Sequence, residues 1–433
     1  MGEDPALTPN LDRFAAESLA CTDAVSNCPL CSPFRAMLLT GKYPSANGVT
    51  DNCSSRPYMA SSYLRANERC LSDVLADSGY DLGYIGKWHL EHPEPPFVDP
   101  GPEAWDEYTP PERRHGFSFW HSHGIYDNHL APRYWVGDSP RDRPTTFYQW
   151  SPRHEADVAI SYIRNEGGRV RDPARPFALF VAMNPPHPPW DMVPGEYVQR
   201  YAHLPVRDLL NRPNVDFDST SGEVISGIGS AHLYFAAVTG VDHQFGRILQ
   251  CLADEGLAKD TIVVFTSDHG EMLGSHGRMG KMVWYEESLG IPFIIRWPGV
   301  IRPRRDDLLL SVPDIMPSLL GLLGLGSRTP QGVQGIDLSE TILGGSGPRP
   351  SSALYIQAGA EQFGARGVRT HLHTYAYNRS VRAGSSELLF DNVHDPYQMK
   401  NLARRDAATA AGLHREMIAW LERIDDPWLK AGT

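Results

Sequence analysis

Residues 261–271 read TIVVFTSDHGE, an apolar run typical of a buried strand that ends in a cluster of ionisable residues. A long amphipathic helical pattern over residues 231–255 precedes this run, and a second short apolar run, PFIIRW, follows it at 292–297. Apolar strands that alternate with helices predict an α/β sheet covered on both faces. Because ligands bind such sheets beyond the carboxyl ends of the strands, the DHGE cluster is a candidate functional site.

The same alternation continues towards the N-terminus. Residues 177–184, FALFVAMN, form an apolar strand pattern that stops at PPHPPW, and residues 80–89, YDLGYIGKWH, form a short strand with charged residues at its end. Helices are expected at residues 8–20, 71–79 and 154–165. Polar and ionisable residues therefore follow several of the expected strands, and we expect them to gather at one edge of the sheet.

Three further segments set the expected domain organisation. Residues 105–150 are rich in aromatic residues, His, Pro and Arg, and we expect them to form a long insertion over one face of the sheet. Residues 324–352 are rich in Gly, Ser and Pro, which is typical of a linker. We therefore expect a large α/β domain over residues 1–345 and a smaller α+β domain over residues 346–433, with a small antiparallel sheet and a last helix.

The composition is that of a globular protein, with 433 residues of which 41% are hydrophobic and 21% charged. The net charge of −12 disfavours nucleic acid and anionic membranes as partners, so an anionic substrate would need a local cluster of Lys, Arg and His. No apolar segment is long enough to span a bilayer, and the first twenty residues lack the pattern of a secretory signal. As written, the sequence predicts a cytoplasmic protein.

Residues 27–44 read NCPLCSPFRAMLLTGKYP and contain two of the six cysteines, three positions apart. Cys-x-x-Cys pairs occur in redox dithiols and in zinc sites. A zinc site needs a second pair of ligands, and Cys53 and Cys70 are too far apart in sequence to supply one. We therefore expect neither kind of site, and we expect Cys28 to be a small buried residue.

The second half of that stretch, CSPFR at 31–35 followed by LLTGK at 38–42, resembles the signature of the type I sulfatases. Other segments match blocks of the same family in the family's order: TPNLD at 8–12, GKWH at 86–89, NPPHP at 184–188, SDHGE at 267–271, GK at 280–281 and LFDNVHDPYQMKNL near the C-terminus. In that family a formylglycine-generating enzyme oxidises the cysteine of Cys-x-Pro-x-Arg to formylglycine. The resemblance therefore selects Cys31, and not Cys28, as the functional cysteine.

The resemblance implies an alkaline-phosphatase-like α/β fold, with a mixed, mostly parallel sheet between helices and a smaller C-terminal α+β domain. It implies hydrolysis of a sulfate ester, carried by a small molecule or a glycan. Two alternatives stay open. SDHGEMLGSHG and the following Gly-Lys are also similar to phosphonate monoester and phosphodiester hydrolases of the same superfamily, and the protein could be an inactive sulfatase-like protein that binds its ligand.

Cleavage of a sulfate monoester needs an in-line nucleophile, a cationic cradle for the non-bridging oxygens and a proton for the leaving oxygen. By resemblance, Arg35 orients the nucleophile, while Lys87 and Lys281 hold sulfate oxygens. His187 contacts the sulfate near the leaving oxygen and could protonate that oxygen, alone or together with Lys281. His89 contacts the hydrated aldehyde and removes its second proton, which expels sulfate and restores the carbonyl.

Asp268 and His269 resemble the second half of the family's metal site, which the group derived from Cys31 completes. The resemblance favours Ca²⁺, and the imidazole of His269 also admits Mn²⁺ or Zn²⁺, because Ca²⁺ prefers oxygen ligands. Sulfatases normally begin with a strand that ends in an Asp pair, and residues 1–7 are too short to contain it. A truncated sequence, ligands recruited from elsewhere in the chain and loss of metal binding are three open explanations, of which we favour truncation. A signal peptide lost with that strand would make the protein periplasmic or secreted.

Aromatic and basic residues of the 105–150 segment could contact a glycan. Trp120, Trp135 and Trp150 could stack on sugar rings, and Arg113 and Arg114 could pair with anionic groups. We favour the alternative that these aromatic residues pack the insertion against the sheet.

Overall fold

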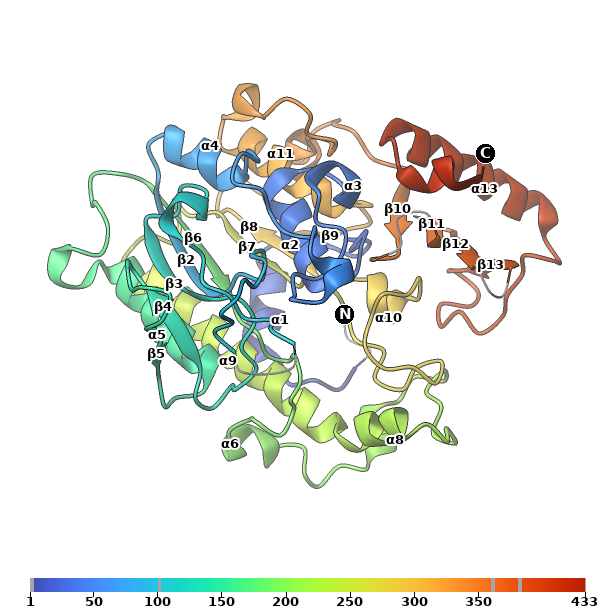
Figure 1. The fold of residues 1–433 in the computed structure, drawn as a ribbon, viewed down its shortest axis with the longest axis horizontal. Coiled ribbons are helices and arrows are strands. Elements are labelled where there is room, and N and C mark those ends of the chain that lie inside the picture. Colours follow the sequence, from blue (N-terminus) through green and yellow to red (C-terminus); the bar gives the residue numbers. More distant parts are fainter. Residues whose placement is uncertain (1–3, 100–102, 360–362, 381–383, 433) are drawn as a thin grey trace.

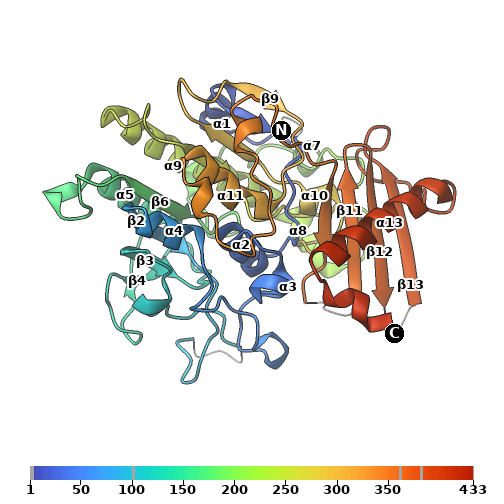
Figure 2. The same cartoon turned by 90° about the horizontal axis from the view of Figure 1, so that it is seen from above.

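The computed structural model describes residues 4–99, 103–359, 363–380 and 384–432. Figures 1 and 2 show two parts side by side, a larger α/β part and a smaller C-terminal part, drawn in red, in which a helix lies across one sheet. Within the described residues no single helix is long and apolar enough to cross a membrane, although Gly222–Gly229 and Ala231–Asp254, which meet at 50°, pass this test together by length and composition.

The described strands of the larger part form two mixed sheets and are β1 (Leu19–Cys21), β2 (Asp81–Lys87), β3 (Phe119–His123), β4 (Arg133–Val136), β5 (Thr145–Thr146), β6 (Phe177–Ala182), β7 (Val263–Thr266), β8 (Phe293–Arg296) and β9 (Arg304–Asp306). Their orders are β5-β4-β3-β2-β6 and β7-β8-β1-β9. Parallel pairings join β2 to β3 and β6, and β1 to β9, whereas the other four pairings are antiparallel. The sheets are mixed as expected, but only three of the seven described pairings are parallel, so the expectation of mostly parallel pairing does not hold for the number of strand pairs.

Helices cover both faces of these sheets, as expected, and their bounds are α1 (Pro9–Ala16), α2 (Cys31–Thr40), α3 (Pro44–Asn47), α4 (Leu71–Asp77), α5 (Ser151–Arg164), α6 (Gly195–Val198), α7 (Val206–Leu209), α8 (Gly222–Gly229), α9 (Ala231–Asp254), α10 (Glu286–Leu289), α11 (Val312–Leu322) and α12 (Ser339–Ile342). Side chains alternate between the faces of a strand. In β6, Phe177 and Leu179 therefore pack with α5 and α9, whereas Ala178 and Phe180 pack with α2, α4 and α11.

Strands β3, β4 and β5 come from the 105–150 segment, which was expected to lie over one face of the sheet. Instead β3 pairs in parallel with β2, and β4 and β5 follow it antiparallel, so part of this segment extends the sheet at its edge. The irregular period of the segment gave no sign of these strands. As a consequence, the carboxyl end of β3 lies beside that of β2, where Lys87 pairs with His123 in register.

The C-terminal part consists of four antiparallel strands and a long helix: β10 (Ser352–Ile356), β11 (Gly364–Thr370), β12 (His373–Ser380), β13 (Gly384–Asp391) and α13 (Ala407–Arg423). One hydrophobic cluster contains Leu354 and Val368 of this sheet together with Phe34 of α2 and Ile315 of α11. The two parts of the molecule therefore share a core. The domain boundary at residue 345 stays a prediction.

Candidate active site

Cys31 is the first residue of α2, so its side chain lies at the positive end of the helix dipole. The start of the helix is fixed by two contacts of Ser32, whose hydroxyl donates to the carbonyl of His89 at 2.6 Å and whose N–H donates to Oδ1 of Asn52 at 3.1 Å. The helix ends at Gly41, which has a φ of 64° that suits glycine. The sequence CSPFRAMLLTG is therefore one helix with Cys31 held at its beginning.

Cys31 is buried, with a relative exposure of 1%, and basic groups surround its thiol. Nζ of Lys87 and Nε2 of His269 each lie 3.5 Å from Sγ. Burial raises the pKa of the Cys31 thiol, but the charges of Lys87 and Lys281 and the imidazoles of His269 and His89 more than offset this, and the pKa falls well below its usual value. Position 31 is therefore built to hold a negative charge.

His89 lies beside Cys31 with one defined tautomer. Nε2 is 3.1 Å from the carbonyl oxygen of Cys53, and because a carbonyl only accepts, Nε2 carries the proton. Nδ1 is buried and has no hydrogen-bond partner among the described residues. Burial, with the charges of Lys87 and Arg35, lowers the pKa of His89, so this ring is neutral and Nδ1 can accept a proton. The φ of His89 is 52°, a strained value that tertiary contacts must maintain.

Arg35, one turn after Cys31 in α2, ties this helix to two strand ends. Nη1 donates to the carbonyl of Lys87 at 2.6 Å, and Nη2 lies 3.6 Å from Oδ2 of Asp268. Burial lowers the pKa of Arg35, but Tyr84 and Asp268 raise it by more, so the guanidinium stays charged. Its Nε is buried without a partner among the described residues.

Lys87, Lys281 and His187 supply positive charge or N–H donors around the thiol. Lys87 ends β2 and its Nζ lies 3.2 Å from Oδ1 of Asn184, which follows β6. Burial lowers the pKa of Lys281, but the charges of Cys31 and Asp268 raise it above its usual value, so Lys281 is protonated. His187 lines the same cavity as both lysines. This set can hold a tetrahedral anion.

Cys31, Asp268 and His269 are the described side chains at this site that could hold a metal ion, because their ligand atoms all lie within 4.8 Å of one another. Nδ1 of His269 donates to the carbonyl of Gly270 at 2.9 Å, so Nε2 is the ring nitrogen that faces Cys31 and that a cation would bind in place of a proton. Burial raises the pKa of Asp268, but His269 and Arg35 outweigh it, so Asp268 is ionised. One carboxylate, one imidazole and residue 31 fit part of a cation's coordination shell.

A cavity of about 1930 Å³ adjoins these residues. It passes between β6 and β7, which are end strands of their respective sheets. These two apolar strands are therefore half-buried, whereas the similar apolar residues Phe293–Arg296 of β8 are almost all buried. Arg369 and Tyr397 of the C-terminal part also line the cavity.

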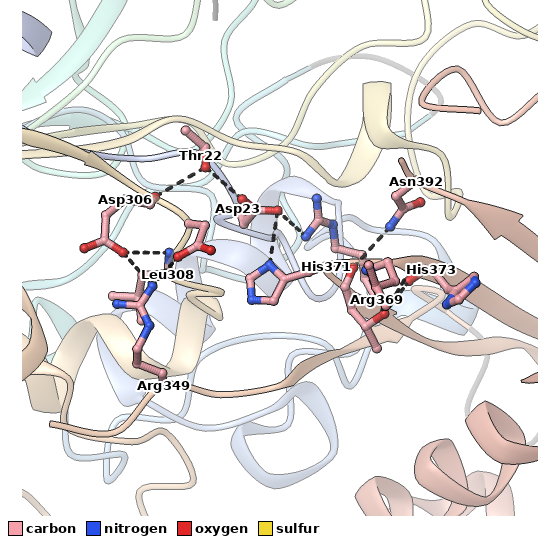
Figure 3. A network of polar contacts seen from close by, with 12 residues as sticks. Thr22, Asp23, Asp306, Leu308, Arg349, Arg369, His371, His373 and Asn392 are labelled. Carbon is pink, nitrogen blue, oxygen red and sulfur yellow. Dashed lines mark hydrogen bonds and ion pairs between the residues drawn. The ribbon is translucent and has the colours of Figure 1, made fainter. Parts of the chain in front are cut away.

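Arg369 of β11 connects the C-terminal sheet to this cavity. Its guanidinium pairs with Asp23, which follows β1, and its Nε lies 3.0 Å from Oε1 of Glu286 in α10. Figure 3 shows Arg369 and His371 converging on Asp23 from the C-terminal hairpin. Because both carboxylates come from the larger part, these ion pairs fix the C-terminal sheet as one wall of the cavity.

The structure brings the predicted residues together in two groups. Direct contacts join Cys31 to Lys87 and His269, and Arg35 to Asp268. Lys281 lowers the pKa of the Cys31 thiol through its charge, and His89 lowers it as a close neighbour. His187 is reached from Lys87 through Asn184 and a further carboxylate, Asp127.

Two of these linking residues, Asn184 and Asp127, were not singled out from the sequence. Asn184 opens the NPPHP block, and Asp127 follows β3 in the 105–150 segment. The rule that functional residues follow strand carboxyl ends would have found Asp127 if β3 had been recognised.

The three tryptophans and two arginines singled out in the 105–150 segment are engaged within the protein. Trp120, Trp135 and Trp150 are 2%, 1% and 4% exposed, so the favoured alternative, that they pack the segment against the sheet, is confirmed. Arg113 pairs with Glu91, and the buried Arg114 donates to the carbonyl of Thr109 at 3.1 Å. The three tryptophans are therefore not free to stack on sugar rings, and both arginines contact acceptors within the protein.

Cys28 and the cysteines that could have formed a zinc site are buried free thiols. Cys28 has no exposed surface and belongs to the hydrophobic cluster that joins α2 to the C-terminal sheet. The expectation of a small buried residue is confirmed.

Comparison with known proteins gives one consistent result. The sulfatase family model matches residues 1–325, and a model described as N-sulphoglucosamine sulphohydrolase, C-terminal, matches residues 274–425. The chain is 44% identical to an endo-4-O-sulfatase of Bacteroides thetaiotaomicron, over 98% of this chain and 87% of the relative, and 34% identical to an ulvan-active sulfatase of Formosa agariphila, over 93% and 73%.

A solved structure, from work on the metabolism of multiple glycosaminoglycans by Bacteroides thetaiotaomicron, matches with a TM-score of 0.93 at 42% identity. The match covers 99% of this chain and 91% of that one. The expected alkaline-phosphatase-like α/β fold with a C-terminal part is confirmed.

Proposed function

Because this chain belongs to the sulfatase family and is a sulfuric ester hydrolase, we propose that its substrate is a sulfated glycan and that a 4-O-sulfate on a sugar is the group removed. The support for a glycan is the identity of 44% to an endo-4-O-sulfatase over nearly the whole chain. The cavity beside the site has walls from both parts of the molecule. The relatives named above are sulfatases, so sulfate is favoured over phosphonate.

The observation that carries the proposal is the environment of Cys31, a buried position at a helix start that faces Lys87, Lys281 and His269. A sulfate group needs cations around its non-bridging oxygens, and preorganised charges in a buried site stabilise the transition state more strongly than charges in water. An overall charge of −12 makes this local positive cluster the place where an anion can bind.

Family membership implies formylglycine at position 31, and the surroundings of Cys31 fit this modification. Nδ1 of His89 and Nε of Arg35 are both buried and lack partners among the described residues. A thiol is a weak hydrogen-bonding group, whereas the hydroxyls of a hydrated aldehyde donate and accept strongly. The hydrated aldehyde supplies the nucleophilic oxygen, and a formylglycine-generating enzyme is the maturation partner that this requires.

The remaining side chains have distinct roles in this proposal. His89, neutral with Nδ1 unprotonated, takes a proton from the hydroxyl at position 31. Arg35 orients that residue, and Lys87 and Lys281 hold the sulfate oxygens. His187 gives a proton to the leaving sugar oxygen, which is needed because an alkoxide is a poor leaving group.

Asp268 and His269 would hold the divalent metal ion that family membership implies, together with residue 31. When bound, the cation polarises a sulfate oxygen and the group at position 31. Ca²⁺ is the first candidate by family, while imidazole among the ligands also suits Mn²⁺ or Zn²⁺.

The test is to co-express the full chain with a formylglycine-generating enzyme and to measure inorganic sulfate released from a 4-O-sulfated glycosaminoglycan oligosaccharide. The 6-O-sulfated isomer and an aryl phosphonate are the comparison substrates. We expect sulfate release from the 4-O-sulfated oligosaccharide and at least about tenfold slower turnover of the other two substrates. In the 6-O-sulfated isomer the ester is misplaced and loses the orientation on which the rate depends, and the phosphonate lacks the sulfate group for which the site is proposed. No release from protein whose residue 31 carries the modification would contradict the proposal, and equal turnover of the isomers would contradict the 4-O assignment.

A further inference from the structure

Asp127 lies at the edge of the anion site, in the loop after β3. Its Oδ1 accepts a hydrogen bond from Nδ2 of Asn184 at 3.0 Å and lies 3.3 Å from Nδ1 of His187. Its side chain is 43% exposed, against 18% for that of His187, so this pair forms the open side of a site whose other side is buried. No sulfatase block of the sequence includes Asp127.

A carboxylate at this place works against binding of an anion, because like charges repel. Its charge does act on its neighbours. Burial raises the pKa of Asp127, but the hydrogen bond and charge of His187, the charge of Lys87 and the hydrogen bond from Asn184 hold it far below its usual value. The charge of Asp127 also raises the pKa of Lys281. Because the negative charge of Asp127 repels a bound sulfate, we look for a role of this carboxylate that offsets the repulsion.

The contacts of Asp127 complete a continuous chain across the site. Nζ of Lys87 contacts Sγ of Cys31 at 3.5 Å and Oδ1 of Asn184 at 3.2 Å. The amide nitrogen of Asn184 then donates to Asp127, whose same oxygen faces His187. One carboxylate oxygen of Asp127 therefore contacts His187 directly and Lys87 through the amide of Asn184.

These contacts also fix the protonation pattern of the His187 ring. Nδ1 lies 2.7 Å from the carbonyl oxygen of Pro188 and 3.3 Å from Asp127, and both neighbours are acceptors. Nδ1 therefore carries a proton, and Nε2 is the nitrogen that can exchange one with a substrate. His129 holds the backbone here as well, since its Nε2 lies 2.9 Å from the carbonyl oxygen of His187.

We infer that Asp127 is a positioning residue, which holds the imidazole of His187 and the amide of Asn184 so that Nε2 of His187 can protonate the leaving oxygen. This inference rests on the proposed function, because it assigns the leaving-group proton to His187. Asp127 would thus be a residue of the 105–150 segment that takes part in the reaction, whereas the tryptophans and arginines discussed above pack or pair within the protein. An imidazole held by a carboxylate is a common way to fix the orientation of an acid or base.

The experiment compares two substrates whose leaving groups differ in their need for a proton. The leaving group of the 4-O-sulfated oligosaccharide is a sugar alkoxide, which needs a proton. The leaving group of 4-nitrophenyl sulfate is a stable phenolate, which does not. For Asp127→Ala we expect kcat on the oligosaccharide to fall by about 10- to 100-fold, within the range that general acid catalysis contributes, and kcat on 4-nitrophenyl sulfate to fall by less than about threefold. KM for the oligosaccharide should change little.

Asp127→Asn separates position from charge. The amide oxygen of asparagine can accept the hydrogen bonds that Oδ1 accepts now, so we expect this variant to recover kcat on the oligosaccharide to within about threefold of the unsubstituted protein. Asp138→Ala, at a side chain of the same segment that is 93% exposed, is the matched control and should leave both rates unchanged. An equal loss on both substrates in Asp127→Ala, or an Asn variant as slow as the Ala variant, would overturn the inference.

A second measurement keeps this inference separate from the proposed function. In protein labelled with ¹⁵N-histidine, the Nδ1–H signal of His187, assigned by its absence in His187→Gln, should be protected from exchange. We expect Asp127→Asn to retain that protection and Asp127→Ala to lose it, whether or not any sulfate ester is cleaved. Unchanged protection in Asp127→Ala would contradict the positioning role, whereas an inactive but protected protein would contradict only the function.

Discussion

Cys28 and Cys31 are three residues apart and equally buried, yet the structure gives their thiols opposite properties. Cys28 lies among apolar side chains of the core that α2 shares with the C-terminal sheet, and burial raises its pKa far above the usual value, with Arg366 offsetting little. Cys31 starts α2, and two lysines and two imidazoles reverse the effect of burial. Burial alone therefore does not mark a reactive residue. The local cations do.

The largest expected effect separates these two cysteines directly. Cys31→Ala removes the only side chain that the proposal allows as nucleophile, and we expect kcat for sulfate release to fall by about 10⁴-fold or more. Cys28→Ala changes a side chain of similar size three residues away and should leave kcat within about twofold, as a neighbour outside the site would. Similar activity losses in both variants would remove the distinction between the two positions.

The next effect tests whether the cations make the difference. Lys87→Ala removes the charge that lies nearest to Cys31, and we expect kcat to fall by about 10²- to 10³-fold, as for loss of one preorganised charge-stabilising group. Lys259→Ala, at an exposed lysine outside the cavity, is the control and should have no effect. Steady-state rates on 4-nitrophenyl sulfate measure both, and a loss below about threefold for Lys87→Ala would show that Lys87 does not hold the sulfate.

Glu155 sharpens the comparison, because it is a buried acid whose pKa is set by burial even though the charge of Arg35 acts on it. Burial raises its pKa from 4.5 to about 8, although Tyr134 and Arg35 lower it. The folded protein thus keeps this proton where the unfolded chain releases it, so its stability falls as pH rises from 4.5 to 8. Glu155→Gln mimics the protonated acid and should gain about 4 kcal/mol over the original protein at pH 8 and nothing below pH 4.5.

Denaturant unfolding at several pH values measures this gain. Glu166→Gln, at an exposed glutamate, is the matched control. A constant difference between Glu155→Gln and the original protein at all pH values would contradict the raised pKa of Glu155.

The smallest effect concerns the stability contribution of Cys28. Its side chain is fully buried in the shared core, so Cys28→Ala leaves a small cavity and should lower the free energy of unfolding by about 1 kcal/mol. Urea unfolding measures this loss. An increase in stability would show that the sulfur is poorly accommodated and that Cys28 is not an ordinary core residue.

Much of the architecture could be predicted from the sequence because its elements have strong local signals. The apolar runs at β6, β7 and β8 and the long amphipathic helix α9 lie within about two residues of where they were expected. The three-residue strand β1 and the strands of the 105–150 segment could not be predicted, since their pairing depends on partners far away in sequence.

The candidate site shows the same division. Cys31, Lys87 and Asp268 were found because each belongs to a motif or follows a strongly apolar strand. Asp127 follows a strand with no clear period, so nothing local marked it. The burial of Trp120 and its neighbours was favoured from the sequence but not fixed by it, because an aromatic residue in an irregular segment is compatible both with a core and with a sugar-binding surface.

The most direct test of the account is the chemical state of residue 31 in active protein purified after co-expression with a formylglycine-generating enzyme. Trypsin releases residues 14–35 as one peptide, which contains both Cys28 and Cys31, so Cys28 is an internal control for the modification. Tandem mass spectrometry should find an aldehyde at position 31, a thiol at position 28, and a modified fraction that rises in proportion to sulfatase activity. A fully active preparation in which residue 31 remains a cysteine would contradict the account.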